Sequence, residues 1–401
     1  MINRACRVCS SSKLKSVIDL GFHPIADTFL EESHLHEEQK TYPLRVMLCE
    51  DCGYAGLEFV VPSEVRYQLV DYSYTSANSP VSIKHFNEVA AEVADFAALG
   101  SEDLVVDVGS NDGTLLAGFK SASGCKILGV EPAPNIAKLA VSLGIPTIAK
   151  FFDSSVVEEV VSGGKPKVII TANVLNHASD LHTFVGTAKQ MLAEDGFFVF
   201  EVPYLLDLVE KTAFDTIYLE HVSYYGIKPL KKLFEQFGFV IRRIEHTDYM
   251  GGSIRVYVGT GEESVSVAEY VERENAVSLY DLKTYKDFMA RVQGLRLDLC
   301  KQLYDARSAG KKIVGIGAAT KGNTLLNYCK IDASLLDYVT DVSDLKVGKY
   351  TPGSHILIKH DNELDASVDY ALILPWNIAE FLVKKLSHLK CEFIIPHTEK
   401  I

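Results

Sequence analysis

The sequence contains no hydrophobic run near the roughly 20 residues that a membrane-spanning helix requires, although 47% of its 401 residues are hydrophobic. The N-terminal stretch MINRACRVCSSSKLK also lacks the apolar centre of a secretion signal. From these two absences we expect a soluble, cytoplasmic protein without a membrane partner.

Basic residues are in deficit, with 40 Lys and Arg against 53 Asp and Glu, which gives a formal net charge of −13. A broad nucleic-acid surface needs clustered cations, so this balance argues against a nucleic-acid partner and leaves room only for a local basic pocket. Tandem repeats and low-complexity tracts are absent as well. The composition is that of a globular protein of two or three domains, and a monomer is compatible with it.

The eight cysteines fall into two groups. Cys6 with Cys9 and Cys49 with Cys52 form two CxxC pairs, while the other four are scattered singly. Two such pairs in one short segment predict a tetrahedral zinc site, because each turn presents two thiolates to one ion. Redox-active or unrelated cysteines are the alternative. Four thiolates leave no position for water, so the predicted zinc is structural and stabilises a segment too short for its own core.

The hydrophobic periods divide the chain into regions. Residues 42–61 read as two strands around the second cysteine pair, within a metal module at 1–70. Apolar segments that alternate with helical patterns then predict a parallel α/β sheet within 71–261. Residues 262–309 show helical periodicity, and a strand, a glycine turn and a helix restart a smaller α/β unit at 310–401.

A glycine turn, VVDVGSNDGTLL, follows the first strand of the larger sheet and opens a helix. Small residues such as Gly109 let a ligand approach the backbone, and Glu131 ends the next strand, where a carboxylate can bind ribose hydroxyls. An ordinary α/β turn is the alternative. A carboxylate at Asp107 disfavours a pyrophosphate, so the pattern favours a cationic cofactor that contains a nucleoside.

The stretch TIYLEHVSYY places Tyr218, Glu220 and His221 close together. Core packing of tyrosines around a satisfied histidine is the plain interpretation. A helix would put Tyr218 and His221 on one face, a strand would pair Tyr218 with Glu220, and a loop could bring all three together. The sequence leaves these three geometries open.

These motifs carry a family resemblance. VDVGSNDG and GVEP resemble the first two motifs of S-adenosylmethionine-dependent methyltransferases. Their order with the cysteine pairs, YLEH and GIGAATKGNTLLN resembles the C-methyltransferases of nucleotide-linked 4-keto-deoxysugars. The resemblance implies a class I methyltransferase (Rossmann-like) core, a small N-terminal zinc-binding module and a C-terminal Rossmann-like α/β domain. It also implies methylation of C3 of a nucleotide-linked 4-keto-6-deoxysugar through a base-generated enolate.

The same resemblance implies catalytic roles. His221 is the base, Glu220 orients its ring or raises its basicity, and Tyr218 is a donor or proton relay. His177 stabilises the oxyanion, and Tyr72 positions the sugar or transfers a proton. The physics is compatible with these roles, because imidazole titrates near neutrality and can exchange protons.

Ligand contacts follow by resemblance as well. The cofactor would be held by Asp107, Gly109, Asp112, Glu131, Phe151, Phe152 and Asn173. The nucleotide diphosphate of the substrate would meet Arg255, Lys321, Asn323, Lys349 and Trp376. Two other functions remain open: an O- or N-methyltransferase or reductase of a related nucleotide sugar, and a zinc-containing protein that only binds nucleotides.

Overall fold

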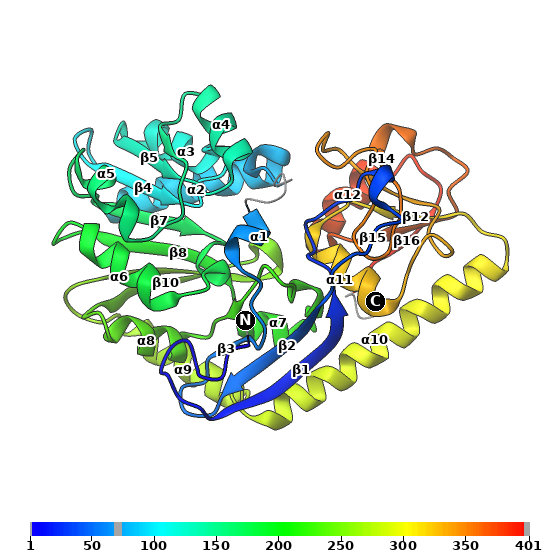
Figure 1. The fold of residues 1–401 in the computed structure, drawn as a ribbon, viewed down its shortest axis with the longest axis horizontal. Coiled ribbons are helices and arrows are strands. Elements are labelled where there is room, and N and C mark those ends of the chain that lie inside the picture. Colours follow the sequence, from blue (N-terminus) through cyan, green and yellow to red (C-terminus); the bar gives the residue numbers. More distant parts are fainter. Residues whose placement is uncertain (1, 68–73, 397–401) are drawn as a thin grey trace.

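Three β-sheets organise the chain in the computed structural model, which describes residues 2–67 and 74–396. The N-terminal sheet lies between a larger central unit and a smaller C-terminal unit, and one long helix runs beneath them (Figure 1). None of the helices in the described residues combines the length and the apolar character that crossing a bilayer demands.

The N-terminal sheet is antiparallel and contains β1 (Leu14–His23), β2 (Tyr42–Cys49) and β3 (Ala55–Leu57). Its fourth strand, β9 (Ser223–Tyr224), comes from the central unit and pairs with β3. The sequence pattern predicts β2 and β3, but β1 escapes it. Two register shifts against β2 interrupt the alternation by which a strand is recognised.

The central sheet has seven strands in the order β10-β11-β8-β7-β4-β5-β6. They are β4 (Leu104–Val108), β5 (Lys126–Val130), β6 (Thr147–Ile148), β7 (Val168–Ala172), β8 (Phe197–Pro203), β10 (Val240–Thr247) and β11 (Ser253–Gly259). Neighbours from β8 to β6 are parallel, as predicted, but β11 is antiparallel to both β8 and β10. The predicted parallel sheet is confirmed for β4, β5, β7 and β8. The added strands β10 and β11 are antiparallel to each other because their short connection cannot include a crossover helix.

Helices accompany the central sheet. They are α1 (Ser63–Tyr67), α2 (Pro80–Phe96), α3 (Thr114–Ser123), α4 (Pro134–Ser142), α5 (Val157–Val161), α6 (Leu181–Met191), α7 (Leu205–Glu210) and α8 (Ile227–Glu235). Local chemistry explains where α2 begins: the Ser79 side chain accepts the N–H of Ser82, and Pro80 supplies a helical φ. From β4 the chain adds β5 and β6 on one side, and it then returns to add β7 and β8 on the other side. At such a switch point, α/β sheets bind ligands at the carboxyl ends of the strands.

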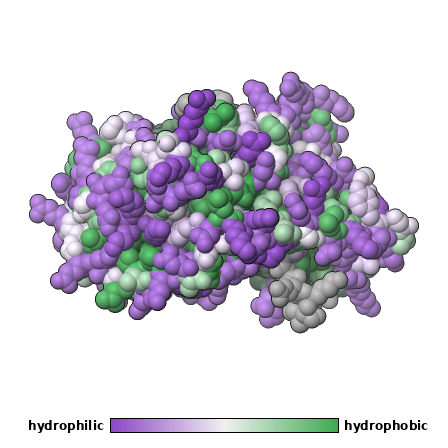
Figure 2. Space-filling view, turned by 90° about the horizontal axis from the view of Figure 1, so that it is seen from below, coloured by the Kyte–Doolittle hydropathy of each residue, from purple (hydrophilic) through white to green (hydrophobic). Residues whose placement is uncertain are grey.

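Two helices, α9 (Ser266–Ala276) and α10 (Leu282–Ser308), connect the larger units. Glu274 fixes α9 to the core from a fully buried position, because its carboxylate accepts hydrogen bonds from Tyr204 at 2.9 Å and Tyr280 at 2.5 Å. Seen from below, the molecule is mainly hydrophilic and its hydrophobic areas are small and separate (Figure 2).

The C-terminal sheet is parallel throughout, with the order β14-β13-β12-β15-β16. It contains β12 (Ile313–Ile316), β13 (Tyr338–Asp341), β14 (Ile358–His360), β15 (Tyr370–Ile373) and β16 (Glu392–Ile394), with helices α11 (Thr320–Cys329) and α12 (Ala379–Lys385). Successive strands are added on one side of β12 up to β14, and on the other side from β15 onward. The carboxyl ends of β12 and β15 are therefore a second switch point of the kind where α/β sheets bind ligands.

The N-terminal module bridges the other two units. It joins the central unit through β9 and the C-terminal unit through α11. Asn323 donates to the carbonyl of Ala26 at 2.7 Å, and the hydroxyl of Thr320 donates to Asp27 at 3.0 Å. The two ligand-binding edges are therefore held in one assembly by a module that belongs to neither sheet.

Candidate active site and metal centre

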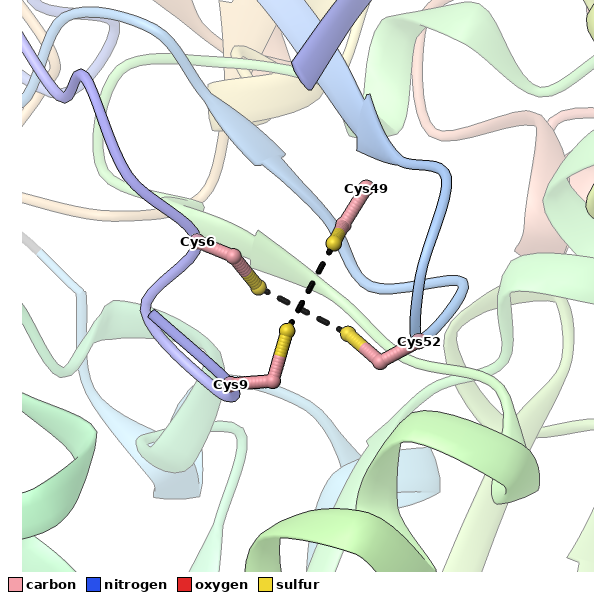
Figure 3. Close-up of side chains that lie close together, drawn as sticks. All are labelled: Cys6, Cys9, Cys49 and Cys52. Carbon is pink, nitrogen blue, oxygen red and sulfur yellow. Dashed lines mark hydrogen bonds between the residues drawn. The ribbon is translucent and has the colours of Figure 1, made fainter. Parts of the chain in front are cut away.

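The four paired cysteines converge on one point (Figure 3). Their sulfur atoms lie within 4.8 Å of one another, and the Cys6–Cys52 and Cys9–Cys49 separations are both 3.6 Å. Four thiolates at the usual Zn–S bond length of about 2.3 Å form a tetrahedron of nearly this size. The donor set therefore fits a zinc ion, and it leaves no coordination position for a substrate.

A cavity of about 870 Å³ lies where the central unit, the N-terminal module and the C-terminal unit meet. The predicted site residues that line it are Gly109, Glu131, Phe151, Phe152, Asn173, His177, Tyr218, Glu220, His221 and Lys321. The structure thus brings cofactor, catalytic and substrate candidates into one space. Tyr72 lies outside the described residues.

Glu131 and the glycine turn line one end of this cavity, where the cofactor was predicted to bind. Glu131 accepts the N–H groups of Asn111 at 3.0 Å and Ala133 at 2.8 Å, and burial raises its pKa to about 7. Gly109 has a φ of +68°, and a Cβ at this position would lie 2.4 Å from Val174. The backbone conformation and the close packing both require glycine here.

Asp107 and Asp112 do not line the cavity. Asp107 is buried within β4, and burial together with the nearby Glu131 raises its pKa. Asp112 accepts the N–H of Thr114 at 3.1 Å at the start of α3, and that of Ala77 at 2.8 Å. Both side chains shape the turn, and their contact with the cofactor stays a prediction. The neighbouring Asn111, which the sequence reading missed, does line the cavity.

The YLEH residues form a loop that turns through a hydrogen bond from the N–H of His221 to the carbonyl of Tyr218 at 3.0 Å. The ring Nδ1 of His221 lies 2.9 Å from the carbonyl oxygen of Thr216, which can only accept. Burial lowers the pKa of His221 to about 3, so the ring is neutral and its single proton is on Nδ1. Nε2 consequently accepts from the Tyr218 hydroxyl at 2.5 Å.

Glu220 belongs to the same loop, but its carboxylate points toward the backbone of Asp27. Its Oε1 accepts the N–H of Asp27 at 2.9 Å, while its buried Oε2 has no hydrogen-bond partner among the described residues. Burial, with the charge of Asp27, raises its pKa to about 7. The carbonyl of Thr216, rather than Glu220, meets the ring Nδ1 of His221. A contribution of Glu220 to the basicity of the ring stays a prediction.

His177 follows β7 in a short 3-10 helix, at the edge where a ligand was expected. Its ring centroid lies 4.9 Å from that of His221, and the planes meet at 63°. Its Nδ1 is 2.5 Å from the hydroxyl of Tyr67, a residue of α1. Burial lowers the pKa of His177, and nearby His221 and Arg66 lower it further. No sequence motif marks Arg66 or Tyr67.

Lys321 begins α11 at the ligand-binding edge of the C-terminal sheet. Its Nζ donates to Asn377 at 2.7 Å and lies 4.7 Å from the ring centroid of Trp376. Burial lowers its pKa to about 8. Two further polar residues of this sheet line the cavity, Asp341 at the end of β13 and the buried Lys346, and neither was predicted as a contact.

Arg255, the expected pyrophosphate contact, does not line the cavity. It is buried in β11 with carboxylate oxygens of Glu201 at 3.2 Å and Glu245 at 3.3 Å, and Glu92 is a third partner. The alternation of β11 directs this side chain into a network of acidic groups, which neutralises its charge.

Three other predicted contacts lie away from the cavity. Asn323 donates to Ala26 within the interface of the N-terminal module. Trp376 donates from Nε1 to Asp215 at 2.9 Å, and Lys349 forms a salt bridge of 3.3 Å with a glutamate of the N-terminal module. These contacts join the units to one another, and the assignment of the three residues as nucleotide contacts stays a prediction.

Comparison with known proteins gives matches along most of the chain. Three family models match: "Putative zinc binding domain" over residues 6–67, "Methyltransferase domain" over 83–244 and "C-methyltransferase C-terminal domain" over 248–396. The C-methyltransferase NovU of Streptomyces niveus is 31% identical over 403 residues, which cover 98% of this chain and 95% of that protein.

Solved structures match the chain in part. A magnesium protoporphyrin IX methyltransferase from Synechocystis PCC 6803 is 15% identical, with a TM-score of 0.34, and the match covers 45% of this chain and 79% of that chain. An S-adenosylmethionine-dependent methyltransferase from Clostridium acetobutylicum is 14% identical, with a TM-score of 0.37, covering 45% and 92%.

Proposed function

The chain belongs to the S-adenosylmethionine-dependent C-methyltransferases, and we propose that it methylates C3 of a nucleotide-linked 4-keto-6-deoxysugar. One observation carries the proposal. Two neutral histidines with ring centroids 4.9 Å apart share a cavity with a ribose-binding carboxylate and a buried lysine. Carbon methylation beside a ketone needs such a pair, one group to remove a proton and one to stabilise the oxyanion.

His221 is the base in this mechanism. Its Nε2 carries the lone pair, which accepts from the Tyr218 hydroxyl in the free protein. Once the substrate displaces that hydroxyl, Nε2 takes the C3 proton while electrons move into the C4 ketone. The depressed pKa keeps the ring unprotonated and makes proton capture unfavourable. An anionic diphosphate in the same cavity raises the pKa of the imidazole, which favours the transfer. The Tyr218 hydroxyl orients Nε2 and stays close to the moving proton.

His177 donates a hydrogen bond to the C4 oxygen as negative charge develops there. Bound S-adenosylmethionine would supply the methyl group: its S–CH3 bond would break as C3 bonds to the methyl carbon, with S-adenosylhomocysteine leaving and the C4 ketone restored. Glu131 binds the ribose of the cofactor, with Gly109 allowing close approach of the backbone and Phe151, Phe152 and Asn173 lining the same end of the cavity. The zinc ion has no part in these steps.

The C-terminal edge holds the nucleotide diphosphate. Lys321 and Lys346 supply positive charge, and the N-terminus of α11 adds backbone N–H groups. Asp341 ends the strand next to β12, the position from which a carboxylate accepts ribose hydroxyls. Gly317 makes the intervening turn with a φ of +79°, and a Cβ there would lie 2.8 Å from Pro375.

The metal centre also bears on where the protein is located. Its four free thiols suit the reducing cytoplasm.

The test is incubation of the purified protein with isotopically labelled S-adenosylmethionine and a panel of nucleotide-linked 4-keto-deoxysugars, followed by mass spectrometry. We expect one label, attached to C3, and exchange of the C3 proton with solvent deuterium. Label on oxygen or nitrogen, without exchange at C3, would overturn the proposal in favour of an O- or N-methyltransferase. Reduction of the ketone without label would indicate a reductase.

A further inference from the structure

The two active-site histidines have different hydrogen-bond partners at the same ring atom. Nδ1 of His221 faces the carbonyl of Thr216 at 2.9 Å, whereas Nδ1 of His177 faces the hydroxyl of Tyr67 at 2.5 Å. A carbonyl only accepts, but a hydroxyl can donate. The partner at Nδ1 decides which nitrogen carries the proton in a neutral imidazole.

Tyr67 is placed to donate. The Nη1 atom of Arg66 lies 3.4 Å from the Tyr67 oxygen, and the cationic guanidinium repels a hydroxyl proton that points toward it. Burial raises the pKa of Tyr67, so the phenol keeps its proton near neutral pH. With the guanidinium on one side of the hydroxyl and Nδ1 of His177 at 2.5 Å on the other, we infer that the Tyr67 proton is directed at Nδ1, which places the ring's own proton on Nε2.

Arg66 holds both histidine loops. It is 2% exposed and donates to the carbonyl oxygens of His177 and Glu220, each at 3.2 Å, and to the hydroxyl of Ser179 at 2.9 Å. Its positive charge also acts on the Glu220 carboxylate, whose pKa it lowers against the larger effect of burial. That charge disfavours protonation of the nearby His177 ring.

We propose that Tyr67 and Arg66 are positioning residues that hold His177 as the Nε2–H tautomer, opposite to the Nδ1–H tautomer of His221. The two rings then have separate tasks: His177 presents an N–H to the substrate oxygen, and His221 presents a lone pair to the C–H bond. This division rests on the proposed function, whereas the tautomers themselves are a property of the free protein.

Nitrogen-15 NMR of histidine-labelled full-length protein tests the tautomers directly, because protonated and unprotonated ring nitrogens have well-separated shifts. We expect Nε2–H for His177 and Nδ1–H for His221. Tyr67→Phe should leave His177 as a mixture of tautomers without changing His221. The matched control is Tyr225→Phe, which removes a buried hydroxyl that donates to Leu175 at 3.0 Å in the same 3-10 helix. It should leave both rings unchanged.

Either of two results would overturn the proposal: Nδ1–H on His177 in the wild type, or an unchanged His177 tautomer in Tyr67→Phe. This measurement needs no substrate, so it decides the proposal even if the sugar panel shows no methyl transfer.

A kinetic comparison tests the assigned task. The amide nitrogen of glutamine reaches the place of Nε2, and that of asparagine reaches the place of Nδ1. His177→Gln should therefore retain a kcat about 10-fold or more above that of His177→Asn, at a similar KM, since removing one oxyanion donor is a large loss. Equal kcat values for these two variants, with the wild type active, would contradict donation from Nε2.

Discussion

The hydroxyl of Tyr54, in the cysteine-rich module, lies 2.8 Å from the hydroxyl of Ser223, which follows the YLEH loop. The N–H of Leu57 donates to the carbonyl of Val222 at 3.0 Å in the same region. The strand that leaves the catalytic loop is thus paired to the strand that follows the second cysteine pair. Metal binding and the position of His221 are mechanically linked, although no thiolate reaches the cavity.

Removal of the metal should therefore reduce both stability and turnover. Structural zinc sites contribute much of the folding free energy of small modules, so we expect Cys52→Ser or chelation to lower Tm by roughly 10 °C. Metal analysis, thermal unfolding and kcat measure the three effects. Cys125→Ser, at a buried cysteine outside the cluster, is the matched control. Metal-free protein with an unaltered Tm would refute the link.

Replacement of His221 by asparagine should remove the base and leave the fold intact. General-base catalysis supplies about 10²-fold or more, so we expect kcat to fall by that factor, together with the rate of C3 deuterium exchange. Cofactor affinity, measured by calorimetry, should stay within about two-fold of the wild type, because this ring does not form the cofactor end. His388→Asn, at an exposed position, is the control. Undiminished turnover in His221→Asn would eliminate the assignment.

Glu220 makes stability depend on pH in a defined direction. Its folded pKa of about 7 lies above the ordinary value of 4.5, so the folded protein binds the proton more tightly than the unfolded chain. Its contribution is fully present below pH 4.5 and is lost as pH rises to about 7, by roughly 3 kcal/mol in the limit.

Glu220→Gln cannot titrate, so its Tm relative to the wild type should be higher at pH 8 than at pH 5. Parallel thermal unfolding at both pH values provides the measurement. Glu102→Gln, whose wild-type side chain is 88% exposed, should show no such difference. A Tm offset for Glu220→Gln that is the same at both pH values would count against the raised pKa.

Glu131 should determine cofactor affinity. Hydrogen bonds to a charged group contribute about 1.5–3 kcal/mol, so Glu131→Gln should weaken S-adenosylmethionine binding by roughly 10-fold or more, as measured by calorimetry. Glu158→Gln, at an exposed site on α5, should leave the Kd unchanged. If both variants bind the cofactor equally well, the ribose is held elsewhere.

Lys321 and Lys349 were both predicted to contact the nucleotide, and the structure distinguishes them. Lys321 lines the cavity and Lys349 does not, so Lys321→Gln should raise the KM for the nucleotide sugar about 10-fold, with Lys349→Gln near the wild type. The pKa of Lys321, lowered to about 8, means that wild-type affinity for the diphosphate should fall as pH rises above about 8. A reversed order of the two variants would restore Lys349 as the contact.

Much of this protein follows from local pattern. The two CxxC pairs, the apolar strands with their glycine turns, and the run of Tyr218, Glu220 and His221 each combine residue types whose chemistry depends on near neighbours in the chain. Zinc ligation, the α/β architecture and the region of the active site could therefore be predicted. Gly109 and Glu131 lie at the cavity for the same reason: strand ends and turns fix where such residues point.

Local sequence patterns could not predict the contacts between segments that are distant in the chain. Arg255 and Trp376 carry the right chemistry for a nucleotide, but tertiary packing pairs them with carboxylates. Tyr67 reaches His177 across 110 positions, and nothing in its own neighbourhood marks it. Residue type and spacing thus determined the metal ligands, the sheets and the candidate histidines. Only the folded chain decided which partner meets each ring nitrogen, because hydrogen bonds across the cavity depend on how three separate units pack together.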